Sequence, residues 1–83
     1  MTTTENYHLT LKMEVLKVQT AAIGAAISRQ MTALKIDNEA DPLYILYLQV
    51  GYLETTQILL AKNEQELNRI QEYIDGVRSS LTR

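Results

Sequence analysis

The chain has 83 residues, a formal net charge of −2 at pH 7 and no cysteine. A chain this short forms one domain at most, and its own hydrophobic core is marginal. The absence of cysteine excludes disulfides and thiolate metal sites, and the small negative charge provides no field that would attract nucleic acid.

The first predicted element is a helix from about residue 4 to residue 36. One mostly apolar face alternates steps of four and three, as a helix requires: Leu9, Met13, Leu16, Thr20, Ile23, Ile27, Gln30 and Leu34. A second row lies beside it, formed by Leu11, Val15, Val18, Ala22 and Ala25. Because one antiparallel partner helix covers only one of these rows, we expect the second row to be an interface with another molecule.

The clearest break in the helical pattern is a turn at residues 37–41. Asn38 tolerates the left-handed conformation that often ends a helix. Asp41 is a strong N-cap, and Pro42 suits the first helical position, where no backbone N–H is needed. A loop of this length makes the two flanking helices antiparallel neighbours.

The second predicted helix runs from Pro42 to about residue 79. Its main feature is an apolar stripe that recurs every seven residues, as in a coiled-coil seam: Leu46, Leu53, Leu60, Leu67, Ile74 and Leu81. Gly51 lies inside this pattern and is interpreted as tolerated, while Asp75–Gly76 is an alternative end point. The two helices together predict one domain over residues 1–83 with an all-α fold, an antiparallel two-helix hairpin with coiled-coil-like packing.

The end of the stripe extends beyond the first helix in this hairpin. A register that places Leu53 near Ile23 and Leu67 near Leu9 leaves the last turns without an intrachain partner. The uncovered residues are Ile70, Ile74, Val77 and Leu81. An exposed apolar stripe suggests a contact between molecules, so these residues are also predicted to form an interface, the alternative being a frayed tail.

Three tyrosines, Tyr44, Tyr47 and Tyr52, cluster at the start of the second helix. Tyrosine combines a rigid apolar ring with a hydroxyl, which makes it a common interface anchor. An equally good interpretation is that these rings cap the end of the hairpin.

Residue types that support catalysis or metal binding do not occur together. His8 is the single histidine, and no carboxylate pair accompanies it at metal-ligand spacing. Glu64 and Glu66 are two residues apart and therefore do not share a helix face. We expect no enzymatic activity, no catalytic residue, no metal and no cofactor.

The segment from Asp41 to Gln49, followed by Glu54, resembles the needle and inner-rod subunits of type III secretion systems. Members of that family are short helical hairpins with a central turn that ends in a Ser/Asn/Asp-Pro step and a glutamine seven residues later. Pro42, Gln49 and Glu54 fit this pattern. The resemblance implies a subunit that assembles into a hollow secretion filament through contacts with its own copies.

Two other functions are compatible with the same features. One is a small helical co-chaperone or adaptor that binds an apolar partner helix, for example a needle-subunit chaperone, and the other is a regulatory module that docks through a helix. The expected partners are copies of the chain or another helical protein, without nucleic acid or membrane insertion. Met1–Tyr7 lacks the pattern of a cleaved secretory signal, so we expect a bacterial cytoplasmic location or export without such a signal.

Overall fold

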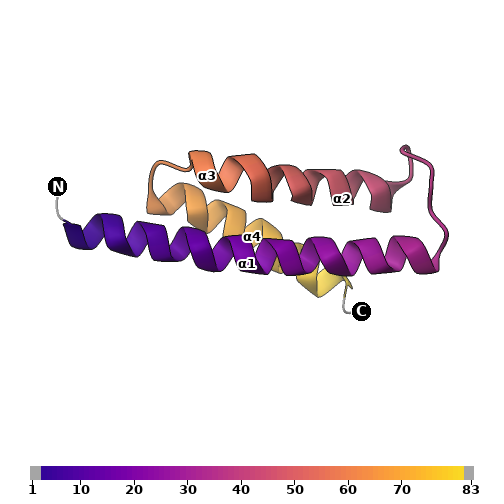
Figure 1. Ribbon diagram of the computed structural model, residues 1–83, viewed down its shortest axis with the longest axis horizontal. Coiled ribbons are helices and arrows are strands. Elements are labelled where there is room, and N and C mark those ends of the chain that lie inside the picture. The colour runs from indigo at the N-terminus through magenta and orange to yellow at the C-terminus, as the bar shows by residue number, and fades with distance from the viewer. Residues whose placement is uncertain (1–2, 82–83) are drawn as a thin grey trace.

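The structure, a computed structural model, describes residues 3–81 and is all-helical over that range. Its elements are α1 (Thr3–Ala33), α2 (Pro42–Tyr52), the π-helical turn η1 (Leu53–Gln57), α3 (Ile58–Leu60) and α4 (Glu64–Leu81). Figure 1 shows α1 along the length of the molecule, α2 to α3 running back beside it, and α4 crossing α1 diagonally. The all-α prediction is confirmed, but these residues do not form a two-helix hairpin. They form three helical segments that we call arms: α1, the segment from α2 to α3, and α4.

The connection between α1 and α2 depends on one left-handed residue and one side-chain cap. Lys35 has a φ of 56°, and the N–H of Ile36 donates to the Met31 carbonyl at 2.9 Å, which is a Schellman-type helix end. The left-handed residue is therefore Lys35 and not Asn38. On the other side of the loop, the N–H of Leu43 donates to Oδ1 of Asp41 at 2.9 Å, so Asp41 caps α2.

A π-helical turn changes which side of the second arm faces the core. The Ile58 N–H donates to the Leu53 carbonyl, five residues back instead of four. The extra residue rotates the following residues relative to α1, so Ile58 is fully buried and Leu60 is 67% exposed. The seven-residue stripe had predicted the opposite arrangement, with Leu60 in the seam.

The predicted continuous helix from Pro42 to about residue 79 is wrong because the chain breaks at residues 61–63. Ala61 is extended, with φ −63° and ψ 130°. Oδ1 of Asn63 accepts the Glu66 N–H at 3.0 Å, and the Asn63 amide donates to the Glu66 carboxylate at 3.2 Å. Asn63 thus supplies an N-cap for a new helix, and this cap competes with continuation of the preceding one.

The break lets α4 fold back against α1, and this contact completes the core. The buried apolar side chains come from all three arms: Leu16, Ile23 and Ile27 of α1, then Val50, Leu53 and Ile58, then Leu67, Ile74 and Val77 of α4. Thr20 is also buried, and its hydroxyl donates to the Leu16 carbonyl at 2.7 Å, so this polar group is satisfied. The predicted C-terminal overhang is therefore wrong, because Ile74 and Val77 are covered by the chain itself.

Polar links fix α4 along α1. Nζ of Lys12 lies 2.9 Å from a carboxylate oxygen of Glu64 and donates to Oδ1 of Asn68, also at 2.9 Å. Further along the helices, Nε2 of Gln71 donates to Oε1 of Gln19 at 2.7 Å. No helix among the described residues is both long and apolar enough to cross a lipid bilayer.

Candidate protein-binding surfaces

The structure offers no cluster of residues suited to metal binding between residues 3 and 81. No group of three or more His, Asp or Glu side chains lies close enough to hold an ion. His8 is exposed and lies beside Tyr7, with the two ring centroids 6.3 Å apart. Two apolar surfaces are the most prominent exposed features of residues 7–81.

The first apolar surface is a row along α1 that points away from the core. It comprises Tyr7, Leu11, Val15, Val18, Ala22 and Ala25, and we call it the outer α1 row. All six side chains are exposed, and Val18 reaches 70% exposure. The row exists because α1 is apolar on two sides, and the rest of the molecule covers only the side that carries Leu16, Ile23 and Ile27.

Polar groups border the outer α1 row on its α4 side. A hollow of about 390 Å³ there is lined by His8, Leu11, Lys12, Val15, Glu64 and Gln71. The Lys12–Glu64 ion pair stands within this hollow and is solvent-exposed on both sides. The surface thus combines an apolar ridge with a charged border, as protein interfaces commonly do.

The second apolar surface includes the outer face of α2. Residues 42–53 contain no charged side chain, and Ile45, Leu48 and Tyr52 are exposed. This face adjoins a groove of about 630 Å³ between α2 and α4, lined by Ile45, Leu48, Gln49, Tyr52, Leu53, Gln57, Arg69, Ile70 and Tyr73. We call this groove the α2/α4 groove.

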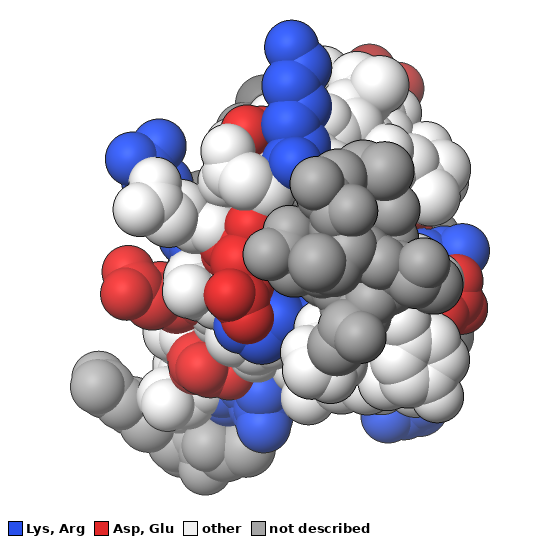
Figure 2. All heavy atoms as spheres, turned by 90° about the vertical axis from the view of Figure 1, so that its left-hand side faces the viewer, with Lys and Arg blue, Asp and Glu red and all other residues white. Residues whose placement is uncertain are grey.

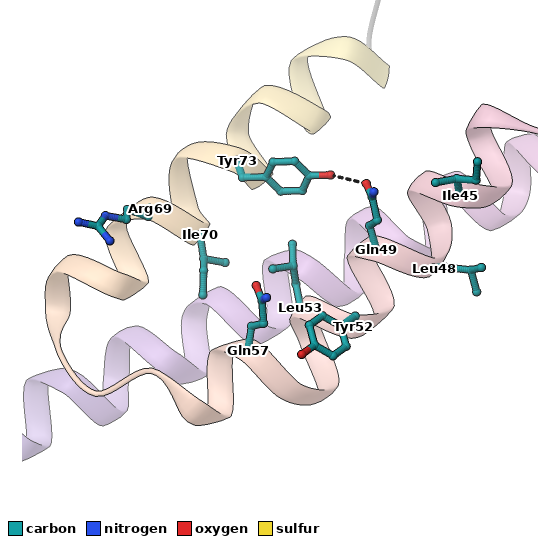
Figure 3. A pocket seen from close by; sticks show the side chains of 9 residues that line it. All are labelled: Ile45, Leu48, Gln49, Tyr52, Leu53, Gln57, Arg69, Ile70 and Tyr73. Carbon is teal, nitrogen blue, oxygen red and sulfur yellow. Dashed lines mark hydrogen bonds between the residues drawn. The ribbon is translucent and has the colours of Figure 1, made fainter.

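The α2/α4 groove forms because both arms pack on α1 and diverge from each other (Figure 3). Leu53 and Ile70 point into the space between the arms, while Tyr73 reaches across it, and its hydroxyl donates to Oε1 of Gln49 at 3.1 Å. The walls are therefore apolar, with amide and hydroxyl groups at a few positions.

The charged side chains at one end of the molecule do not form a patch of a single sign (Figure 2). At the end of the molecule that holds the α3–α4 turn, acidic and basic side chains are interspersed (Figure 2). Two further ion pairs each join residues of a single helix. Arg78 pairs with Asp75 at 2.6 Å in α4, and Lys17 pairs with Glu14 at 4.0 Å in α1. Exposed pairs of this kind contribute little to stability or selectivity.

The residues predicted as interfaces separate into two groups. Leu11, Val15, Val18, Ala22 and Ala25 are exposed together on one helix face. In α4, Ile74 and Val77 lie in the core, Leu81 packs against it, and only Ile70 lines a groove. The α2/α4 groove was not predicted from the sequence, although the charge-free run at residues 42–53 and the cluster with Tyr47 and Tyr52 indicated that this helix carries an exposed apolar face.

Comparisons with known proteins identify the family. The family model for the bacterial epsilon antitoxin matches residues 5–83. Antitoxin PezA of Streptococcus pneumoniae serotype 4 (strain ATCC BAA-334 / TIGR4) is 30% identical over 79 residues, which cover 93% of this chain and 50% of PezA. This chain therefore spans half the length of that relative.

A solved structure leads to the same family. It comes from the molecular and structural characterization of the PezAT chromosomal toxin-antitoxin system of the human pathogen Streptococcus pneumoniae. The two chains are 28% identical and superpose with a TM-score of 0.93 over 99% of this chain and 88% of that one.

These matches overturn the inferred relationship to type III secretion needle and inner-rod subunits, and with it the needle, filament and co-chaperone functions. The similarity rested on Pro42, Gln49 and Glu54. An Asp-Pro step is a general solution for starting a helix after a turn, so it recurs in unrelated helical proteins. The match over residues 5–83 has no such local explanation, and the chain belongs to the bacterial epsilon antitoxin family.

Proposed function

We propose that this chain is an antitoxin that binds a toxin protein and keeps it inactive within a stable complex. The observation that carries the proposal is the family match over residues 5–83, which includes the whole of the described core. The relation to PezA, from a toxin-antitoxin system, supports the same function. The chain acts by occupying a surface of its partner and not by catalysis.

The outer α1 row is the surface that we assign to the toxin. From Tyr7 to Ala25 it follows one helix face for about 27 Å, taking 1.5 Å per residue. The opposite side of α1 is anchored by Leu16, Ile23 and Ile27 in the core, so the ridge is presented on a rigid support. An amphipathic helix that lays its apolar residues into a groove of a partner is a common recognition mode.

The exposed apolar side chains of this row would contribute most of the favourable free energy of binding. Leu11, Val15 and Val18 stand next to one another along the row, and each would lose water contact when a partner covers it. The charged border around Lys12 and Glu64 would then set the orientation of the partner more than the affinity.

Binding to the toxin of the pneumococcal PezAT system tests this function, with PezA as the positive control. Isothermal titration calorimetry should detect a complex with this chain. Val18→Glu places a carboxylate in the middle of the row, and we expect it to weaken binding at least tenfold. Leu60→Glu is the matched control, because Leu60 is similarly exposed but lies outside the row, and it should change the affinity less than threefold.

The outcomes separate the function from the surface. Absence of any complex while PezA binds would contradict the antitoxin function. A complex that Val18→Glu leaves intact would retain the function and exclude the outer α1 row as the contact. A growth assay gives an independent readout, since co-expression of the chain should relieve arrest caused by the toxin and the Val18→Glu variant should not.

A further inference from the structure

We infer that the hollow between α1 and α4 is a subsite for an arginine side chain of the toxin, and that Glu64 recognises this arginine. The inference rests on the proposed antitoxin function and adds the chemistry of one contact to it. The hollow has a volume of about 390 Å³, and we call it the border hollow. Leu11 and Val15 belong both to this hollow and to the outer α1 row, so a partner that covers the row also reaches the hollow.

The border hollow has an apolar wall and a polar wall. Leu11 and Val15 of α1 form the apolar wall, and they are 45% and 54% exposed. Glu64 and Gln71 line the hollow from α4. A side chain that contacts both walls needs an apolar stem and a polar end, and arginine and lysine have this construction.

Two cross-links fix the position of Glu64 relative to the outer α1 row. Lys12 pairs with Glu64, and Gln71 donates to Gln19, and in each case the two residues are 52 positions apart in the sequence. This equal separation means that α4 runs in the same direction as α1, which Figure 1 also shows. Glu64 therefore stays level with the first half of the row and needs no rearrangement to meet a partner that binds there.

Glu64 has most of its hydrogen-bonding capacity unused. Among the described side chains its one polar partner is Lys12, at 2.9 Å, and the side chain of Glu64 is 63% exposed. A carboxylate offers about four acceptor positions, so most of those on Glu64 are open to a partner. Lys12, in contrast, already donates to both Glu64 and Asn68.

Gln71 supplies no free donor to the polar wall. Its amide nitrogen donates to Oε1 of Gln19 at 2.7 Å and to Oδ1 of Asp75 at 2.9 Å. An ionised carboxylate only accepts hydrogen bonds, so Asp75 fixes which end of the Gln71 amide carries the nitrogen. The other polar atom of that amide is an acceptor, and the wall as a whole therefore favours an entering donor.

Arginine is the donor that fits the border hollow best. Its planar guanidinium binds a carboxylate through a pair of parallel N–H groups, and arginine is common among the residues that dominate binding energy at interfaces. Lysine carries a compact and strongly hydrated charge, so it loses more hydration beside an apolar wall. An acidic side chain would face Glu64, and the nearby cation, Lys12, is already paired with that carboxylate.

Calorimetric titration of the whole chain with the toxin of the pneumococcal PezAT system tests the subsite. Glu64→Gln keeps the shape of the side chain and removes its charge, so the dissociation constant should rise about fivefold, and 0.5 M NaCl should reduce this difference. Glu72→Gln is the matched control, because Glu72 is exposed on the same helix and does not line the hollow. It should leave the constant within about twofold of the unmodified chain.

A variant of Lys12 separates recognition from a structural role of the ion pair. Lys12→Gln breaks the same pair as Glu64→Gln, so an effect that came only from loosening α4 would weaken binding in both variants. If Glu64 recognises an arginine, Lys12→Gln removes a competing cation, and the dissociation constant should fall about twofold. Urea denaturation of the free variants checks that both have lost the same small amount of stability.

Double-mutant cycles test the chemistry of the partner side chain. Each surface arginine of the toxin is replaced by alanine, and the affinity is measured with the unmodified chain and with Glu64→Gln. One arginine should lose at least threefold less affinity with Glu64→Gln than with the unmodified chain, because its partner is already gone.

Four results would overturn the arginine subsite and leave the antitoxin function standing. They are a complex that Glu64→Gln does not weaken, equal weakening by Lys12→Gln and Glu64→Gln, weakening by Lys12→Gln alone, and absence of any toxin arginine coupled to Glu64. Weakening by Lys12→Gln alone would assign the hollow to an acidic side chain of the toxin. Absence of any complex while PezA binds would contradict the antitoxin function itself.

Discussion

Replacement of Ile58 by alanine should destabilise the protein far more than replacement of Leu60, although both are aliphatic residues two positions apart. Ile58 is fully buried, whereas Leu60 is 67% exposed. Ile58→Ala removes apolar surface equivalent to about three methylene groups, or about 2.4 kcal/mol, and leaves a cavity, so we expect a total loss of about 3–4 kcal/mol. Leu60→Ala should cost less than about 1 kcal/mol.

Urea denaturation followed by circular dichroism at 222 nm measures both losses. Each variant is compared at the same protein concentration, because self-association would shift the apparent stability. The slope with urea should stay constant, and the melting temperature of Ile58→Ala should fall by about 12–30 °C. A Leu60→Ala variant as unstable as Ile58→Ala would refute the π-helical turn, since a regular helix would instead keep Leu60 in the seam.

Three smaller perturbations test individual interactions by the same denaturation assay. Asp41→Ala removes the cap of α2 and should cost about 1 kcal/mol, whereas Asp41→Asn should keep most of the stability. Thr20→Val replaces a buried hydroxyl that donates to the Leu16 carbonyl, so a change of less than about 1 kcal/mol is expected, and a larger loss would mean that the hydroxyl is structurally required. Lys12→Ala breaks an exposed pair with Glu64 and should cost less than about 1 kcal/mol, an effect that 0.5 M NaCl should reduce.

Local features of the fold were predictable because short-range rules govern them. The steps of four and three along α1 predicted one face, and its members Leu16, Thr20, Ile23 and Ile27 are buried. The last member of the predicted row, Leu34, is 66% exposed, because the helix ends at Ala33. A local signal for the break at residues 61–63 was also present, since Asn63 and Glu66 have the spacing of an N-cap and its reciprocal partner. The continuous seven-residue stripe, however, is typical of one uninterrupted helix through these residues.

The candidate surfaces were only partly predictable. The outer α1 row followed from the sequence, because a helix with two apolar rows cannot bury both against one neighbour. The α2/α4 groove did not, since it exists only where two arms diverge over a third. A short motif could not identify the family either, because the resemblance based on Pro42 and Gln49 described a turn that many helical proteins share.

The sequence by itself determined the helical class, the capped turn before α2 and the inner face of α1, because these depend on residues within a few turns of one another. Only the tertiary structure decided where the rest of the seven-residue stripe lies. The π-helical turn moved Leu60 outward and Ile58 inward, and the reversal at residues 61–63 brought Ile74 onto α1. A periodic stripe shows which residues share a helix face, but the surface that covers them depends on the path of the whole chain. A straight helix would have left the apolar residues of α4 exposed to solvent, whereas the reversal buries them against α1.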